Sequence, residues 1–403
     1  MNLVFVEMKR ILKKPIFWIT VVLIFAFIRS QFGSSINVSR MDKPLPNQEN
    51  YGMIQTSDME IIRKRAVSQL IQEYSINSYT TYPNGFYRNI DLNKEKNTQM
   101  TKIISAIFGV SVENIEKLQS EHSFNSEDYN EFFSGEKVSN EEFLELMDKA
   151  DRLLGGGSFY SKKLIKSQFG ERPMTYDEAI KNYELMIKKD KITGAYARYF
   201  CDYGGIGMGI IPVFLAVALW FQDKRSKCEN LLFIRKTSSS KLVFSRYSAM
   251  LILLSLPLII IASYYNIQII RSFGLENTKP VYFYGYVLIW IIPVLMVVLS
   301  VGTFTTIVTN SPLGILVMMV WWFLDVFKGV SSIKGGYGHN FILRHNIIGN
   351  TQIYLNNRAS IFINRGIYVL IAVVMLIISV KIYDLKREGK VFAYGIRKEK
   401  DIK

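Results

Sequence analysis

The sequence predicts an all-α integral membrane protein with six transmembrane helices, an N-terminal amphipathic helix and a large, mostly helical extracytoplasmic domain between spans one and two. Two observations carry this prediction. Residues 281–324 contain no Asp, Glu, Lys or Arg, and this run could cross a bilayer twice, because one helical span needs about 20 apolar residues. The mean hydropathy of the chain is nevertheless only +0.14, so a large polar segment must accompany the spans.

The charge distribution separates these two parts. The 403 residues carry a formal net charge of +15. Between Arg40 and Arg198 there are 22 basic and 24 acidic residues, whereas the rest of the chain holds 27 basic and 10 acidic ones. A nucleic-acid-binding protein usually carries its basic surface on a soluble fold, and here the soluble segment is slightly acidic. We therefore expect no nucleic-acid partner, and assign the basic excess to the flanks of the spans, beside anionic membrane lipid.

The sequence offers little for catalysis or for metal binding. Its two cysteines, Cys201 and Cys228, are too few for a disulfide framework, and its three histidines lack the spacing of metal ligands. The glycine run at 155–158 lacks the spacing of a phosphate-binding loop, and no Walker-type motif occurs in the chain. We therefore expect no enzyme activity, cofactor or metal in this polypeptide.

The first span is expected at 16–28, between Pro15 and Arg29. The residues before it place apolar side chains on one helical face, which is typical of a helix lying in the membrane interface; they are Val4, Met8, Ile11 and Leu12. A basic start and a short apolar core would also fit a secretory signal. Because Arg29 interrupts the run and no clear cleavage site follows, we interpret 1–32 as the amphipathic helix plus an uncleaved first span.

Residues 33–200 are predicted to form the extracytoplasmic helical domain. Three sequences fit a capping box, in which two side chains bind the free amides at a helix N-terminus; they are Ser57–Glu60, Ser139–Glu142 and Thr175–Glu178. Apolar residues then recur at helical spacing, and the run Gly155–Gly157 is expected to end the second of these helices. No sustained alternation of apolar and polar residues indicates a strand.

Five further spans are expected within 201–403. The 281–324 run is divided at Asn310-Ser311-Pro312, because Pro suits a helix start and the residues before it suit a turn. The other three spans come from the runs 204–221, 247–270 and 366–380. The remaining segments are a cytoplasmic loop at 222–246, an outer loop at 329–365 and a cytoplasmic tail at 381–403.

The basic flanks of the spans predict their orientation. With the N-terminus inside, the short cytoplasmic segments carry nineteen Lys and Arg residues and the short outer connections carry seven. Basic residues near span ends stay on the cytoplasmic side. We therefore expect a multi-pass protein of the cell membrane with both termini in the cytoplasm.

Ionisable residues inside spans are costly and therefore informative. Two occur near the predicted outer ends of helices, Arg29 and Asp325. One hypothesis is that they form an ion pair across the bundle. The alternative is that each reaches interfacial water by itself.

The loop at 222–246 carries the most functional information. Residues 223–233 would form a short amphipathic helix that ends in the apolar edge Leu231-Leu232-Phe233. Apolar residues at the end of a cytoplasmic helix need a partner, and a groove on a soluble subunit could supply it.

Here the chain resembles the permease subunits of type-2, exporter-like ABC transporters. The resemblance covers the membrane part and rests on the amphipathic helix at Leu3–Lys14, the large insertion after the first span, and a loop pattern. That pattern is an acidic residue, Glu-x-Leu-Leu, a Ser-rich turn and a basic residue, present here as Asp223, Glu229-Asn230-Leu231-Leu232, Ser238-Ser239-Ser240 and Arg246.

The resemblance implies a separate ATP-hydrolysing subunit and a second permease, identical or related. It further implies that a coupling helix docks on the ATPase and transmits its closure to the second and third spans, so that a peptide, drug or amphiphile is exported. The coupling residues would be Asp223, Glu229, Leu231, Leu232 and Phe233. The alternative function is a membrane sensor or scaffold whose outer domain binds a ligand and signals to a cytoplasmic partner.

Overall fold

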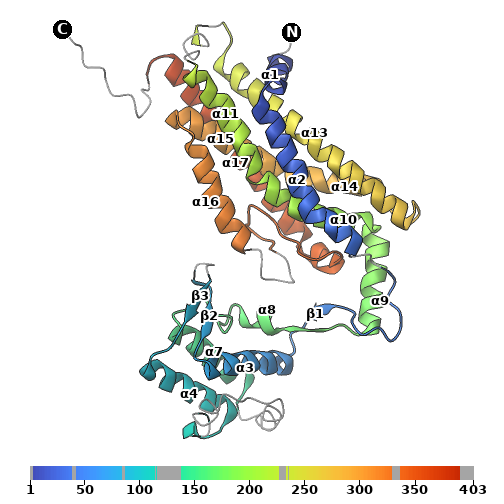
Figure 1. Ribbon diagram of the computed structural model, residues 1–403, viewed down its shortest axis with the longest axis vertical. Helices are drawn as coiled ribbons and strands as arrows, with labels where there is room; N and C mark the ends of the chain where they lie inside the picture. Colours follow the sequence, from blue (N-terminus) through green and yellow to red (C-terminus); the bar gives the residue numbers. More distant parts are fainter. Residues whose placement is uncertain are drawn as a thin grey trace, which may run out of the picture. The chain divides into compact units, whose positions relative to one another are not determined.

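A computed structural model describes residues 3–38, 42–83, 87–113, 115, 138–226, 233–234, 236–328 and 336–390. The contacts divide the chain into two compact units (Figure 1). The inserted unit is essentially Pro44–Ala179, and the bundle unit contains the segments that precede and follow it.

The bundle unit is built from helices. The described ones are α1 (Leu3–Leu12), α2 (Pro15–Val38), α9 (Tyr176–Leu185, which contains the boundary between the units), α10 (Thr193–Met208), α11 (Ile211–Arg225), α13 (Ser239–Phe273), α14 (Pro280–Tyr286), α15 (Ile292–Thr309), α16 (Leu313–Lys328) and α17 (Thr351–Arg387). Two π-helical turns, η2 (Met186–Asp190) and η3 (Val287–Ile291), lead into α10 and α15.

Within the described parts of the chain, five helical segments are long and apolar enough to cross a membrane, which confirms the class of multi-pass membrane protein. They are Pro15–Gly33, Thr193–Arg225, Ser239–Phe273, Pro280–Thr309 and Thr351–Arg387. The predicted turn within the 281–324 run is confirmed, because α15 ends at Thr309 and is followed by Asn310, whose φ of 53° is left-handed. The apolar helix after this turn, α16, has 16 residues and is shorter than these five segments, so the sixth span stays a prediction.

Two of the candidate spans begin more than ten residues earlier than the sequence predicts. The second begins at Thr193 rather than 204, and the last at Thr351 rather than 366. In both cases charged residues had ended the uncharged run: Arg198 and Asp202 in one, Arg365 in the other. All three are buried and paired inside the bundle, and the helices therefore continue through them.

The inserted unit combines helices with two short antiparallel ribbons. Its helices are α3 (Met59–Ser75), α4 (Lys94–Phe108), α7 (Asn140–Leu153) and α8 (Ile165–Phe169). The ribbons pair β1 (Met53–Gln55) with β4 (Glu171–Pro173) and β2 (Tyr79–Thr81) with β3 (Arg88–Ile90). The sequence did not predict these strands, because three residues are too few to establish an alternating pattern.

The helix starts of this region follow the predicted boxes with one shift. Ser139 Oγ accepts a hydrogen bond from Glu142 N at 3.2 Å. Thr175 and Glu178 form both arms of a capping box, at 3.0 and 3.3 Å. At α3 the cap is Asp58 rather than the serine before it. The run of three glycines follows the end of α7 with positive φ angles, as expected.

Several helix ends of the bundle unit gather at what we call the α1 end (Figure 1). Lys386, in the last turn of α17, donates to Asn310 Oδ1 at 2.7 Å, and Lys224 of α11 donates to the Asn310 carbonyl at 3.2 Å. Arg387 Nε donates to the carbonyl of Phe233 at 2.7 Å. The segments that the sequence assigned to one side of the membrane therefore share one end of the bundle.

Candidate functional site

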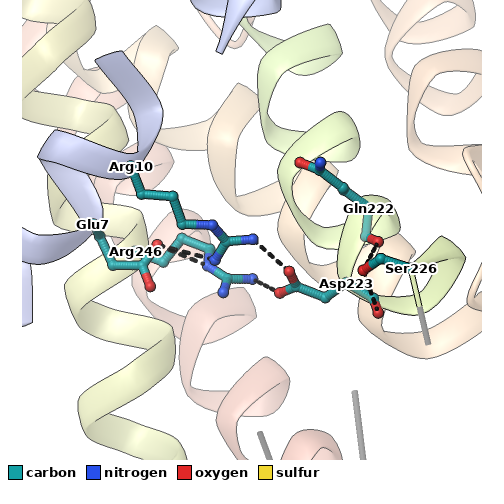
Figure 2. A network of polar contacts seen from close by, with 6 residues as sticks. All are labelled: Glu7, Arg10, Gln222, Asp223, Ser226 and Arg246. Carbon is teal, nitrogen blue, oxygen red and sulfur yellow. Dashed lines mark hydrogen bonds and ion pairs between the residues drawn. The ribbon is translucent and has the colours of Figure 1, made fainter. Parts of the chain in front are cut away.

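Four charged side chains, three of them buried and Arg10 partly buried, form a network at the α1 end that we call the four-residue network: Glu7, Arg10, Asp223 and Arg246 (Figure 2). Arg246 donates from Nη1 to Asp223 Oδ2 at 2.7 Å and from Nε to Glu7 Oε2 at 3.3 Å. Arg10 donates to Glu7 Oε2 at 3.4 Å and also to Asp223. Each acidic side chain thus contacts both arginines.

The network exists because three helices each bring a charge to the same interior point. On α1, Glu7 lies one turn before the buried Ile11 and shares its inward face. Arg246 has no solvent exposure, and its guanidinium lies 4.2 Å from the ring centroid of Trp220. A buried charge is tolerated only when it is paired and hydrogen-bonded. Two cations and two anions meet that condition with a net charge of zero.

The network closes the 222–246 loop at its base. Asp223 lies in the last turn of α11 and Arg246 in the early turns of α13, so their ion pair joins the residues from which the loop leaves and to which it returns. In the same region Ser226 Oγ donates to the carbonyl of Gln222 at 2.8 Å and closes the end of α11 (Figure 2). Because Glu7 binds Arg246, α1 is part of the same base.

The structure gives the predicted coupling residues different surroundings. Asp223 is 8% exposed and points into the network rather than toward a partner. The ring of Phe233 packs at 5.5 Å, centroid to centroid, on that of Tyr383 in α17. These two residues thus hold the loop on the bundle. Glu229, Leu231 and Leu232 lie outside the described residues.

The predicted pair Arg29 and Asp325 is likewise placed among other neighbours. Arg29 is exposed on α2 and lines a groove with Tyr265 of α13. Asp325 of α16 is buried and accepts hydrogen bonds from the backbone amides of Phe341 and Ile342, at 3.1 and 2.6 Å. Asp325 thus holds a loop, a role that the sequence did not predict.

That loop, residues 336–350, is held at the opposite end of the bundle unit by buried charges from several helices. Asp202 of α10 has no solvent exposure. Its Oδ2 accepts the backbone amides of His345 and Asn346, each at 2.7 Å, and its other oxygen binds the Arg344 side chain. A single carboxylate therefore satisfies two loop amides and one loop cation.

Arg198, one turn before Asp202 on α10, holds the end of the same loop. Its guanidinium binds both carboxylate oxygens of Asp190, at 2.7 and 2.6 Å, and donates to the carbonyl of Gly349 at 2.8 Å. Arg365 of α17 donates to the carbonyl of Phe341 at 2.8 Å. The loop backbone is thus bound by charged side chains of α10, α16 and α17.

Asp202 and Arg198 were missed because the predicted second span begins at residue 204. Both residues therefore fell outside the segments in which charged side chains were considered. A signal was present, since the two are spaced i, i+4 on one helical face immediately before a glycine-rich apolar segment. Opposite charges at this spacing beside an apolar segment indicate inward-facing polar groups rather than a domain boundary.

Comparisons with protein-family models, with curated proteins and with solved structures gave no match. The functional interpretation therefore depends on the geometry of the two charged sites and on the loop pattern in the sequence.

We expect His345 to make the 336–350 loop sensitive to acid. Its ring is buried, with Nδ1 against the Tyr337 hydroxyl and Nε2 at 3.0 Å from the Gly349 carbonyl. Burial, with a further contribution from the nearby positive charge of Arg198, lowers the pKa of His345 from 6.5 to about 3. The pKa of His345 is lower in the folded than in the unfolded chain. The contribution of the neutral ring to the stability of the folded loop is therefore complete above pH 6.5 and declines as the pH falls toward 3.

Between pH 6.5 and about pH 5 we expect the free energy of local opening to fall by on the order of 2 kcal/mol. Hydrogen–deuterium exchange of peptides covering 336–350, corrected for intrinsic exchange rates, measures this change. In a His345→Asn variant the acid-dependent part should disappear. An unchanged acid dependence in that variant would assign the effect to another group.

Proposed function

We propose that this chain is the membrane-spanning permease subunit of an ATP-driven exporter in the cell membrane, with both termini in the cytoplasm. It would work with a separate ABC-type ATPase subunit and a second permease, identical or related, and would export a peptide, drug or amphiphile. The observation that carries the proposal is the four-residue network, which joins α1, α11 and α13 at the base of the loop expected to contact the ATPase.

A loop that transmits force must be attached rigidly to the helices at its two ends. If the Asp223–Arg246 pair were absent, a push on the loop would be absorbed where the loop meets its two helices. With the pair in place, the ends of α11 and α13 move together, and α1 moves with them through Glu7. The buried position of the pair supports this role, because buried ion pairs are screened by salt much less than exposed ones.

The length of α13 supports transmission across the membrane. Its 35 residues extend for roughly 52 Å at 1.5 Å per residue, more than the ~30 Å hydrocarbon core. A displacement at Arg246 would therefore reach the opposite side of the bilayer. Pro257 lies inside this helix, and a proline removes one backbone hydrogen bond and permits bending at that level.

The test is co-purification of the full chain from its native membranes, with mass spectrometry to detect an ATPase that carries Walker motifs. We expect such an ATPase to be recovered with the wild-type chain. Substituting both Leu231 and Leu232 by Asp should abolish its recovery and abolish ATP-dependent export. The matched control is Leu275→Asp, because Leu275 is 70% exposed and follows α13, at its other end from the loop.

Retained ATPase association and export in the Leu231→Asp, Leu232→Asp chain would contradict the coupling role of the loop. Failure to recover any ATPase with the wild-type chain would instead favour the sensor or scaffold function. A ligand-binding experiment on the full chain, with the inserted unit as the expected site, would then be the next measurement.

A further inference from the structure

A groove runs along the surface of the bundle unit between α2 and α13, with a volume of about 720 Å³. Its floor is formed by Ile261 and Tyr265, which are 4% and 2% exposed. Exposed apolar side chains form its rims, among them Val22 and Ile260. Arg29 lines the groove at the far end of this stretch of α2 from Val22.

Along the helix axis, the groove is as long as part of one membrane leaflet is thick. On α2 it extends from Val22 to Arg29, seven residues or about 10 Å along the helix axis, whereas half of the hydrocarbon core is about 15 Å thick. The apolar run of α2 ends at Ile28, and Arg29 is followed by Ser30 and Gln31. Arg29 therefore lies where the helix leaves the hydrocarbon, and the apolar part of the groove extends inward from it.

Arg29 is the one charged side chain among the described residues that line the groove. The rest of the described lining is aliphatic or aromatic, with two tyrosines, Tyr264 and Tyr265. A guanidinium matches a phosphate group with parallel hydrogen bonds, and an apolar channel matches an acyl chain. The site thus offers one partner for an anionic head group and one for an acyl chain, in the order in which a membrane lipid carries these two parts.

We propose that this groove binds one anionic phospholipid, with its phosphate on Arg29 and one acyl chain along the floor of Ile261 and Tyr265. A second copy of this chain is the competing occupant. A two-fold symmetric contact uses the same patch on both partners, so closing this face on its copy would place two Arg29 side chains near one axis. Like charges oppose that arrangement, whereas a phosphate neutralises Arg29. The proposal does not depend on the exporter function.

The experiment uses the full chain reconstituted into nanodiscs that contain equal amounts of phosphatidylglycerol and phosphatidylcholine with identical acyl chains. Native mass spectrometry of the chain released from the nanodiscs counts the lipids that stay bound. We expect the wild type to retain phosphatidylglycerol in preference to phosphatidylcholine. Arg29→Gln should lower this preference about fivefold, the effect of one basic residue near an anionic lipid surface, and Arg29→Lys should keep part of it.

Two further variants distinguish the contribution of the lipid head group to binding from that of the acyl chain. Ala26→Phe places a ring in the groove and leaves Arg29 intact, so it should reduce the retention of both lipids. The matched control, Arg271→Gln, removes another exposed cation, from the last turn of α13, and should behave as the wild type. Added inorganic phosphate should not displace the lipid, because it lacks an acyl chain.

Three results would overturn the proposal. The first is an Arg29→Gln chain that retains phosphatidylglycerol as the wild type does. The second is displacement by inorganic phosphate, which would make Arg29 a site for free anions. The third is efficient disulfide cross-linking between two copies that carry Val22→Cys in a Cys228→Ser background, which would assign the groove to a second copy.

Discussion

Replacing Arg246 by Met is expected to lower the free energy of unfolding by about 3–5 kcal/mol, the usual cost of removing one partner of a buried ion pair. The variant leaves Glu7 and Asp223 in the bundle, each having lost its hydrogen bond to this guanidinium. The remaining cation, Arg10, is only partly buried and cannot neutralise both carboxylates. Thermal unfolding of the full chain in detergent micelles measures the loss, and under the proposed function recovery of the ATPase should fall as well.

A matched control and a rescue make this result specific. Arg225→Met removes an exposed cation from the same end of α11 and should change stability by no more than about 0.5 kcal/mol. Adding Glu7→Gln and Asp223→Asn to Arg246→Met removes the unpaired charges and should restore part of the lost stability. A single Arg246→Met variant as stable as the control would show that the network contributes nothing to the folded state.

Asp202→Asn is expected to release the 336–350 loop while the rest of the bundle stays folded. The carboxylate accepts two backbone amides and pairs with Arg344. An asparagine has one acceptor oxygen and an amide group that cannot accept, so either the two loop amides or Arg344 must face the amide group, and in both cases Arg344 loses its counter-charge. We expect a loss of about 3 kcal/mol or more, concentrated in the loop.

Hydrogen–deuterium exchange of the loop peptides is the direct measurement, because it reports local opening separately from global unfolding. Exchange within 336–350 should rise by on the order of a hundredfold, the equivalent of about 3 kcal/mol. Glu276→Gln, in an exposed connection between α13 and α14, is the control and should leave the exchange of the loop unchanged. Equal protection of the loop in Asp202→Asn and in the wild type would show that Asp202 does not hold it.

The apolar parts of this fold could be predicted from the sequence because the membrane imposes a simple rule on them. Long uncharged runs form long helices, and the turn at Asn310 lies where turn-forming residues interrupt the uncharged run 281–324. The start of the Thr193–Arg225 segment was harder to predict. Its start was missed since the rule treats Arg198 and Asp202 as an exit from the membrane, although their partners lie inside the bundle.

The candidate sites show the same limit. Asp223 and Arg246 were recognised from the loop pattern, but nothing local indicates that they bind each other or that Glu7 joins them from 239 residues away. Asp325 was recognised as an unusual charge, yet its partners are backbone amides of a loop, which a search for opposite charges does not find. Long-range pairing depends on the packing of helices and is not visible in residue spacing.

The four-residue network also sets an order of events during synthesis. Glu7 leaves the ribosome 239 residues before Arg246, a delay of roughly 10 to 50 s at 5–20 residues per second. Throughout that interval α1 lacks Arg246, its partner on α13, and its amphipathic character allows it to remain in the membrane interface with its charges in water. Its docking therefore follows translation of the inserted unit, α10, α11 and the start of α13, so a chain truncated before Arg246 would leave α1 undocked. Helix α1 is made before α11 and α13 and yet is among the last parts of the α1 end to reach its final position.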